Sequence, residues 1–310
     1  MEVPEELKAA VPQTTWGRIL TATPIVMTIV ATALAGLASS EMTRAQYRRS
    51  LAAQQQSKAG DQWSLFQAKR VRGTSQRTTL DILEVTTDVH PLDAAALRKV
   101  HPALESPPGE QTLAALQGGN LPVIPAGPAL DPRVVAALEA VENSKPEREI
   151  MAMLARISDK ALDDALGMAR DRAQALDVAL RPVNRTIDEL EARLVRQSAA
   201  DGSRSGPTAT LRRDVTVARL RYTARRYDAE ARLNQAIANV YELQVRKSNI
   251  EAERLHTRSL RFFYGMLVAQ GGVIVATFAM AARQRNALWW LAAVAGVAAI
   301  AYASYVYLAV

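Results

Sequence analysis

Cysteine is absent from the 310 residues of this chain, and aromatic side chains make up only 5% of them. The lack of cysteine excludes disulfide-stapled scaffolds, thiolate metal centres and thiol catalysis. The shortage of aromatics disfavours a β-sandwich or barrel, whose strands are rich in aromatic and β-branched residues. Hydrophobic residues still account for 49% of the chain, mostly as alanine, leucine and valine, and this composition favours helices.

Charge is missing from three long stretches, which are Ile19–Ser40, Phe262–Ala282 and Asn286–Val310, with 22, 21 and 25 residues. A helix needs about 20 residues to cross the hydrocarbon core of a bilayer. We therefore predict three transmembrane helices, at 19–40, 262–282 and 286–310. Aromatic and basic residues flank them in the manner of membrane interfaces: Trp16, Arg18, Arg261, Trp289 and Trp290.

The first stretch is interpreted as a retained anchor rather than a cleaved signal peptide. Small residues of the kind found at cleavage sites are present at 33–35, but the tail at 1–18 is long and carries Glu2, Glu5 and Glu6. A signal peptide begins with a short basic region instead.

The three spans contain no ionisable residue, which disfavours a transporter or proton channel. They do carry small residues at four-residue spacing, which allows helices to approach closely. The candidate packing positions in the membrane are Ala31, Ala35, Gly272, Ala276, Ala292 and Gly296.

The region between the first two spans, 41–261, carries 34 basic and 28 acidic residues, a net charge of +6. The charges are interleaved and form no concentrated basic stripe with aromatics, so nucleic-acid binding is not expected. Five arginines close to the spans are candidates for contact with lipid headgroups: Arg44, Arg48, Arg49, Arg258 and Arg261.

This region divides into three parts. Residues 41–89 are predicted to continue the first span as a juxtamembrane helix. Residues 90–132 hold eight of the fourteen prolines and form a Pro/Gly-rich insertion, where only short helices are expected, near 92–100 and 111–116. Residues 133–261 are predicted to form a helical coiled-coil region.

Apolar residues recur every three or four positions along the coiled-coil region, as one helical face requires. Asp131 and Pro132 start a first helix, and a second begins near Ser144 and carries a stripe from Ile150 to Leu194. Pro182 is expected to kink or break that second helix. From 208 to 264 the chain has neither glycine nor proline, so a single helix is expected to run into the second span. Its stripe comprises Leu211, Val215, Ala218, Tyr222, Ala229, Leu233, Ala236, Val240 and Leu243.

No catalytic constellation is present, and we predict no enzyme, cofactor or metal. His90 and His101 lie near Asp88 and Asp93, but their spacing is not that of metal ligands. The helical carboxylates lie among arginines, where ion pairing is the default.

Residues 60–70, Gly-Asp-Gln-Trp-Ser-Leu-Phe-Gln-Ala-Lys-Arg, follow the first span. This stretch resembles an uncharacterised bacterial membrane-protein family that is known only as a domain of unknown function. The resemblance implies one N-terminal span, a charged helical middle and two closing spans, with the insertion at 90–132 as an addition, and it implies no activity. The residues themselves place Trp63, Phe66 and Gln67 on one helical face. Together with Arg70, that face either packs on the returning helix or binds a partner.

With three spans, the central region and the C-terminus lie on one side of the membrane and the N-terminus and the Arg283 loop on the other. Nine basic residues near the spans lie on the side of the central region, and four lie on the other side. This bias favours a cytoplasmic central region in a bacterial inner membrane, whereas the two arginines of the short loop favour the opposite. The first group is Arg44, Arg48, Arg49, Lys58, Arg246, Lys247, Arg254, Arg258 and Arg261, and the second is Lys8, Arg18, Arg283 and Arg285.

The sequence thus predicts an all-α membrane protein with three transmembrane helices, a long-helix, coiled-coil-like extramembrane domain and a Pro-rich insertion. The predicted function is a non-enzymatic structural or scaffolding subunit that forms a homo-oligomer, as a ring or array. Exposed apolar stripes on the long helices are the reason for expecting self-association. The other partners that we expect are membrane lipids and other subunits of a membrane complex. The alternative is a pore-forming or transport-related component whose spans line a channel on assembly.

Overall fold

The structure is a computed structural model that describes residues 15–125, 127–200, 206–281 and 285–309. In these ranges the secondary structure is helical, without strands. The elements are α2 (Thr15–Thr86), α3 (Ala94–Val100), η1 (Pro102–Glu105), α4 (Pro107–Gly118), α5 (Pro132–Glu142), α6 (Glu147–Leu154), α7 (Asp159–Ala200), α8 (Pro207–Ala281) and α9 (Arg285–Ala309). The all-α prediction is therefore confirmed.

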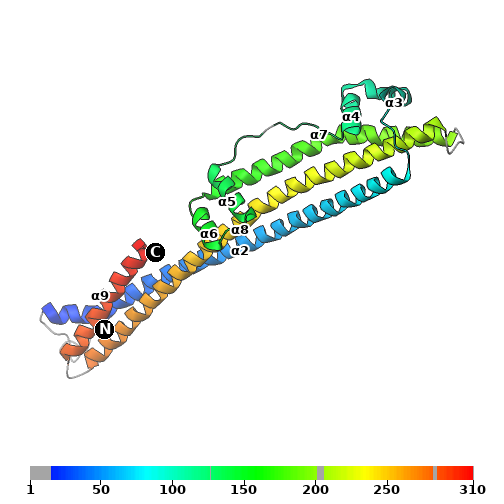
Figure 1. The fold of residues 1–310 in the computed structure, drawn as a ribbon. Coiled ribbons are helices and arrows are strands. Elements are labelled where there is room, and N and C mark those ends of the chain that lie inside the picture. Colours follow the sequence, from blue (N-terminus) through cyan, green and yellow to red (C-terminus); the bar gives the residue numbers. More distant parts are fainter. Residues whose placement is uncertain (1–14, 126, 201–205, 282–284, 310) are drawn as a thin grey trace. The chain divides into compact units, whose positions relative to one another are not determined.

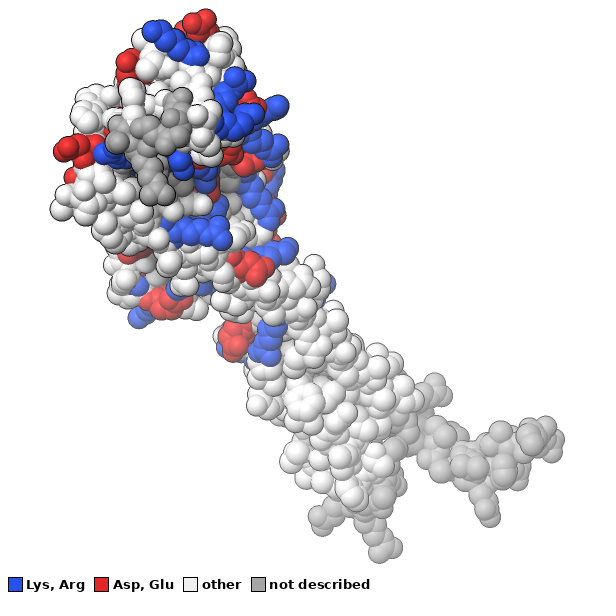
Figure 2. Space-filling model, turned by 90° about the vertical axis from the view of Figure 1, so that its right-hand side faces the viewer, with Lys and Arg blue, Asp and Glu red and all other residues white. Residues whose placement is uncertain are grey.

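The chain divides into two compact units. The membrane unit comprises Met1–Ala52 and Lys247–Val310, and the extramembrane unit comprises Ala53–Arg246. Three helices, α2, α8 and α9, are long and apolar enough to cross a membrane. Figure 2 shows the corresponding difference in surface chemistry, because blue and red side chains are interleaved over the extramembrane unit and are nearly absent from the span surface in view.

In the membrane unit, the ends of α2 and α8 pack with α9 in three small clusters of buried side chains. One contains Met27, Ala31, Ala269 and Ala299. Two others follow along the helices, with members Leu34, Ala38, Phe262 and Val306, and Ala276, Ala279, Trp289 and Ala292. Alanine dominates these contacts, and small side chains let neighbouring backbones lie close together.

In the extramembrane unit, α2, α7 and α8 lie side by side (Figure 1). The main core forms where α7 faces α8 and the insertion covers α7. It contains Leu97, Leu104, Leu113, Ala115, Leu116, Leu176, Leu180, Val183, Ile187, Leu190, Leu194, Val215, Ala218 and Tyr222. The apolar stripes of both long helices are therefore largely buried within one chain.

This burial corrects one expectation from the sequence. We expected a single copy to leave apolar stripes exposed on the Ile150–Leu194 helices and on the following helix. Instead Ile187, Leu190 and Leu194 are at most 2% exposed. The stripes therefore supply no argument for self-association.

The insertion folds into short helices that are tied to the long ones. Asp93 caps α3 by accepting from the amides of Ala95 and Ala96, at 2.9 and 3.1 Å. At the end of α4, Gly119 has a φ of 63°, a conformation in which glycine is favoured. Arg225 of α8 donates to the Gly118 carbonyl at 2.7 Å. A Cβ at Gly119 would stand 2.8 Å from the same guanidinium, so the turn also needs glycine for space.

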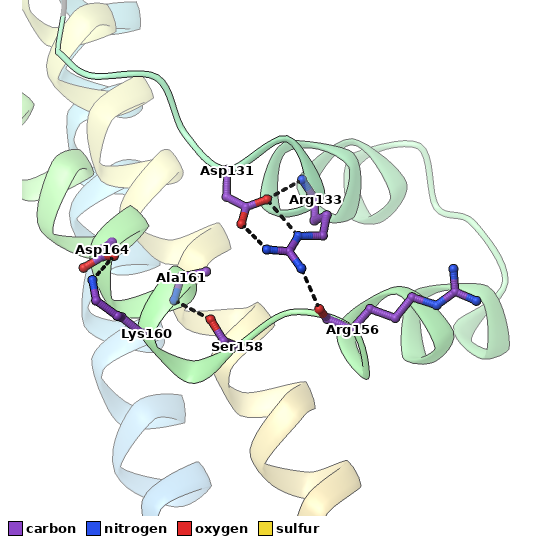
Figure 3. Close-up of polar contacts among 7 residues, drawn as sticks. All are labelled: Asp131, Arg133, Arg156, Ser158, Lys160, Ala161 and Asp164. Atoms are coloured by element: carbon purple, nitrogen blue, oxygen red, sulfur yellow. Dashed lines mark hydrogen bonds and ion pairs between the residues drawn. The ribbon is translucent and has the colours of Figure 1, made fainter.

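The stripe from Ile150 onward does not form one helix, contrary to expectation. α6 ends at Leu154 and α7 begins at Asp159. Ser158 caps the new helix, since its hydroxyl oxygen accepts from the Ala161 amide at 3.1 Å. Arg133 of α5 binds the Arg156 carbonyl at 3.3 Å, which fixes the turn between the two helices (Figure 3).

The same arginine completes the start of α5. Asp131 accepts from the Arg133 amide at 2.9 Å and from its guanidinium at 2.7 and 3.1 Å (Figure 3). These hydrogen bonds stabilise the carboxylate and hold the pKa of Asp131 below its ordinary value. The predicted start of α5 at Asp131 and Pro132 agrees with this geometry.

Pro182 does not break α7, which runs through it from Asp159 to Ala200. Proline removes one amide donor from the helix, but Leu180 and Val183 on either side are at most 2% exposed. Their burial against α8 and the insertion stabilises the helix across the proline. The Thr186 hydroxyl also donates to the Pro182 carbonyl at 3.0 Å.

Candidate functional site

In one of the clusters between the spans, the flexible side chain of Met27 on α2 lies against glycines of both other helices. A Cβ built on Gly296 of α9 would stand 2.5 Å from the Met27 sulfur. A Cβ on Gly272 of α8 would collide with the Met27 methyl and lie 3.3 Å from the Cβ of Ala295. The two glycines thus form a cradle for Met27, and a side chain at either position would require the end of Met27 to move.

The other small residues that we singled out in the spans lie in two settings. Ala31, Ala276 and Ala292 are buried between helices of the same chain. Ala35 is partly exposed and lines an outward-facing groove between α2 and α8 with Thr28, Ala31, Thr32, Gln270, Val273 and Ile274. Most of these positions are therefore already used in packing within one chain.

The juxtamembrane arginines meet glutamates on the neighbouring helix. Arg48 lies 3.0 Å from Glu251, and Arg49 lies 3.7 Å from Glu253. Glu41, which is buried, lies 3.5 Å from Arg44 and 3.9 Å from Arg258.

Arg258 also binds the last helix. It donates to the Tyr307 carbonyl at 3.2 Å, and its guanidinium lies 5.4 Å from the Tyr307 ring and 5.9 Å from the Phe262 ring. Arg261 is half-buried. Four of the five arginines proposed for lipid headgroups thus have protein partners that fix their positions.

The Trp63 face lies between α2 and α8. The indole nitrogen of Trp63 donates to a Glu242 carboxylate oxygen at 2.7 Å, and its ring meets Phe66 edge to face at 5.4 Å. The Arg70 guanidinium lies 5.7 Å from the Phe66 ring. Gln67 and Arg70 are exposed, whereas Trp63 and Phe66 are half-buried.

Ion pairs continue this contact along α2 and α8. Lys69 lies 3.1 Å from Glu230, Arg77 pairs with Asp228, and Arg221 lies 2.6 Å from Glu84. On the other side of α8, Arg219 pairs with Asp188 and Glu191 of α7. Many of the basic and acidic residues that interleave in the sequence therefore join helices to one another.

A polar cavity of about 530 Å³ lies among α2, α7 and α8 in the extramembrane unit. At its wall, Asn184 accepts from the Tyr222 hydroxyl at 3.2 Å and from Arg226 at 3.0 Å. Burial raises the pKa of Tyr222 to about 12, because the phenolate would lose its hydration. Arg219, with its two carboxylate partners, closes another part of the lining. The cavity has the size of a small-ligand site, but most of such sites are more apolar.

The histidines do not come together. The His90 amide donates to Asp214 at 3.0 Å, whereas His101, between α3 and η1 of the insertion, is 1% exposed. The closest carboxylate oxygen to His101 belongs to Glu189, at 3.7 Å. Burial lowers the pKa of His101, and Arg193 lowers it further, while Glu189 acts in the opposite direction. Within the described ranges, no three His, Asp or Glu side chains are grouped so that they would hold a metal ion.

The fold and these surfaces define an all-α membrane protein with a helical extramembrane unit. Residues 21–106 match the family model described as a domain of unknown function, DUF4337. No curated protein and no solved structure matches the chain.

The match covers most of α2 together with α3 and η1. It includes the 60–70 stretch on which the resemblance was noted. It also extends into the 90–132 insertion as far as residue 106, so the first part of that insertion is not an addition to the family domain.

Two features of these surfaces were missed in the sequence. The hydrogen bonds of Asn184 to Tyr222 and Arg226 join residues 38 and 42 positions apart. No local spacing indicates such a pairing. The cradle of Met27 was missed because four-residue spacing describes one helix at a time, whereas Met27, Gly272 and Gly296 lie on three different helices.

Proposed function

We propose that this chain is a non-enzymatic, membrane-anchored scaffolding subunit that works as a homo-oligomer. The observation that carries the anchoring role is the close packing inside the membrane unit, and the exposed Val71, Ile82 and Val85 of α2 support self-association. Met27 occupies the space between Gly272 and Gly296, and Ala269, Ala276 and the other small side chains there are buried. Such packing suits an anchor, since these positions between the spans carry small apolar side chains and Met27 rather than polar groups that would line a water path.

The extramembrane unit supports the same proposal. Its long helices are joined by ion pairs and by a continuous apolar core. A helical body of this kind presents extended surfaces to partners, as solenoids and bundles do, and does not depend on a catalytic cleft. Partners of the scaffold would include further copies of the chain and other membrane-complex subunits.

A pore formed on assembly is the second candidate. The groove between α2 and α8 carries Thr28, Thr32 and Gln270, which are the polar side chains of an otherwise apolar surface. Several copies with this face turned inward would surround a polar lumen. The outward position of Gln270 favours this candidate, and the close packing inside each copy favours the scaffold.

Flux through liposomes separates the two. The purified full-length chain is reconstituted into vesicles that hold a self-quenching dye or a potassium gradient. The scaffold predicts leakage no greater than in protein-free vesicles. Leakage that depends on protein density and falls in Gln270→Leu would overturn the scaffold in favour of the pore.

We further propose that the extramembrane unit lies in the cytoplasm of a bacterium, with the spans in the inner membrane. The excess of basic residues beside the spans on the domain side supports this orientation. Arg44, Arg48, Arg49, Arg258 and Arg261 would lie at the headgroup level, where their ion pairs limit the charge available to anionic lipid. Protease digestion of the domain in inverted vesicles is expected. Digestion only in spheroplasts or right-side-out vesicles would reverse the orientation.

A further inference from the structure

The outer face of α2 in the extramembrane unit carries an uncharged stripe with heptad spacing. Its residues follow one another at alternating steps of four and three, and all seven are exposed. We call them the seam: Ser64, Ala68, Val71, Ser75, Thr78, Ile82 and Val85. Val71, Ile82 and Val85 are 69%, 57% and 87% exposed.

The seam points away from α8. The residues of α2 that contact α8 are Trp63, Lys69, Gly73, Arg77 and Glu84, and they occupy the remaining sides of the helix. A shallow groove runs along the outer side and is lined by Arg70, Val71, Thr74, Ser75, Thr78 and Thr79. No helix of the described ranges covers the seam, since its members remain exposed.

The distribution of charge on α2 is the reverse of what a solvent-facing surface requires. Exposed helical faces normally carry the charged residues. Residues 64–85 include six of them, at 69, 70, 72, 77, 81 and 84, yet none lies on the seam. Apolar and small residues at a and d positions, with charge kept to the sides, are typical of a helix that packs against another helix.

We infer that the seam is the surface through which two copies of this chain associate, as a parallel pair of α2 helices. This inference rests on the proposed scaffold and names the partner surface of its homo-oligomer. α2 is one helix that includes the first span. Two copies with the same membrane topology therefore send α2 out of the bilayer with the same polarity.

The residues that flank the seam permit a parallel, in-register pair. In that arrangement the g position of one helix faces the next e position of the other. The pairs between copies are Gln67 with Arg72, Thr74 with Thr79, and Asp81 with Thr86. None brings like charges together, and Gln67 offers a hydrogen-bond acceptor to the arginine.

The seam spacing also explains where the pairing weakens. One step toward the membrane, the next heptad position is Asp61, which is exposed. In a parallel pair the two Asp61 carboxylates would face each other, and like charges at such positions oppose association. Removal of that charge should therefore strengthen a self-paired seam.

Disulfide cross-linking in native membranes tests the inference, because the chain has no cysteine of its own. Single-cysteine variants Val71→Cys, Thr78→Cys and Ile82→Cys are oxidised with copper phenanthroline. Each is expected to give a species of twice the mass of one chain. Arg70→Cys and Glu84→Cys, exposed on the same helix but off the seam, serve as matched controls and should cross-link several-fold less.

Association itself is measured by energy transfer between labelled full-length chains in liposomes. Ile82→Lys, which places a charge on the seam, should weaken association roughly tenfold or more. The off-seam change Glu84→Gln, which alters the charge by the same one unit without placing a cation beside Arg221, should alter it much less. Asp61→Asn should strengthen association.

Equal cross-linking at seam and control positions, or a loss of association no greater for Ile82→Lys than for Glu84→Gln, would overturn the seam. A product of a mass other than twice that of the chain would identify another occupant and overturn self-pairing. Failure of the scaffold is distinguishable from these results, because it is measured by vesicle leakage rather than by cross-linking.

Discussion

The sulfur of Met27 lies 2.5 Å from the point where a Cβ on Gly296 would stand. This relationship joins the first span to the last, and a side chain on the glycine would force the end of Met27 to move. Gly272 on the middle span meets the methyl group of the same methionine. Met27 of the first span therefore contacts both of the other spans.

We expect Gly296→Leu to destabilise the membrane unit by about 1–3 kcal/mol, since overpacking forces neighbouring side chains out of their rotamers. Thermal unfolding of the detergent-solubilised chain measures this loss. Gly271→Leu is the matched control, because a Cβ there meets nothing within 4 Å. Equal losses in the two variants would show that the Met27 cradle has no special role.

Trp63→Phe removes the hydrogen bond to Glu242 and keeps an aromatic ring beside Phe66. We expect a loss of about 0.5–1.5 kcal/mol, the usual net value of such a bond. Amide hydrogen exchange in α2 should quicken around residue 63. Gln67→Ala, on the same helix and exposed, should leave exchange unchanged, and a similar change in both variants would contradict the assignment of the effect to the indole.

Tyr222 makes the stability of the extramembrane unit sensitive to alkali. Its folded-state pKa of about 12 lies above the ordinary value of 10.0. The stabilisation is therefore complete below pH 10 and is lost as the pH rises through 12, where the folded protein must also ionise. Spectrophotometric titration should show one tyrosine ionising late, and Tyr222→Phe should abolish that late phase. If the late ionisation phase persisted in Tyr222→Phe, it would belong to another tyrosine.

His101 gives the opposite dependence in acid. Its pKa is lowered from 6.5, so the contribution of the neutral imidazole to stability is complete above pH 6.5 and is lost as the pH falls through the folded-state value. The protection factors of amides in α3 and α4, which are corrected for the pH dependence of intrinsic exchange, should therefore fall as the pH is lowered below 6.5. The charged groups that face the ring are Glu189 and Arg193 of α7.

His101→Leu replaces the imidazole with an apolar side chain of similar size. It should remove the pH dependence of the protection factors in α3 and α4. His90→Leu is the control, since His90 is exposed. If the protection factors of His101→Leu still fell in acid, another titrating group would be responsible.

The helices and the spans could be predicted because both depend on local properties. Charge-free stretches near 20 residues, the caps at Asp131 and Pro132, and the absence of Gly and Pro from 208 to 264 each act within a few turns of the chain. The break between α6 and α7 was missed because a contact distant in sequence, from Arg133 to the Arg156 carbonyl, helps to hold it. Continuity through Pro182 was missed because burial of Leu180 and Val183 outweighs the lost amide.

The candidate surfaces depended more on tertiary structure. The 3.6-residue period placed Trp63 and Phe66 on one side of a helix, but only the position of α8 gave Trp63 its partner Glu242. The seam, too, depends partly on the sequence and partly on the tertiary structure. Its heptad spacing is a property of the sequence, whereas its exposure follows from which side of α2 contacts α8.

The sequence by itself determined the helical class, the three stretches able to cross a membrane and the interleaving of charge, because composition and periodicity act through the nearest turns of a helix. Only the tertiary structure decided which apolar stripe is buried, which arginine meets which glutamate, and which glycines hold Met27. These contacts join residues far apart in the chain, such as Trp63 and Glu242 or Arg48 and Glu251. Their energies arise from packing and desolvation between helices, which no local pattern specifies.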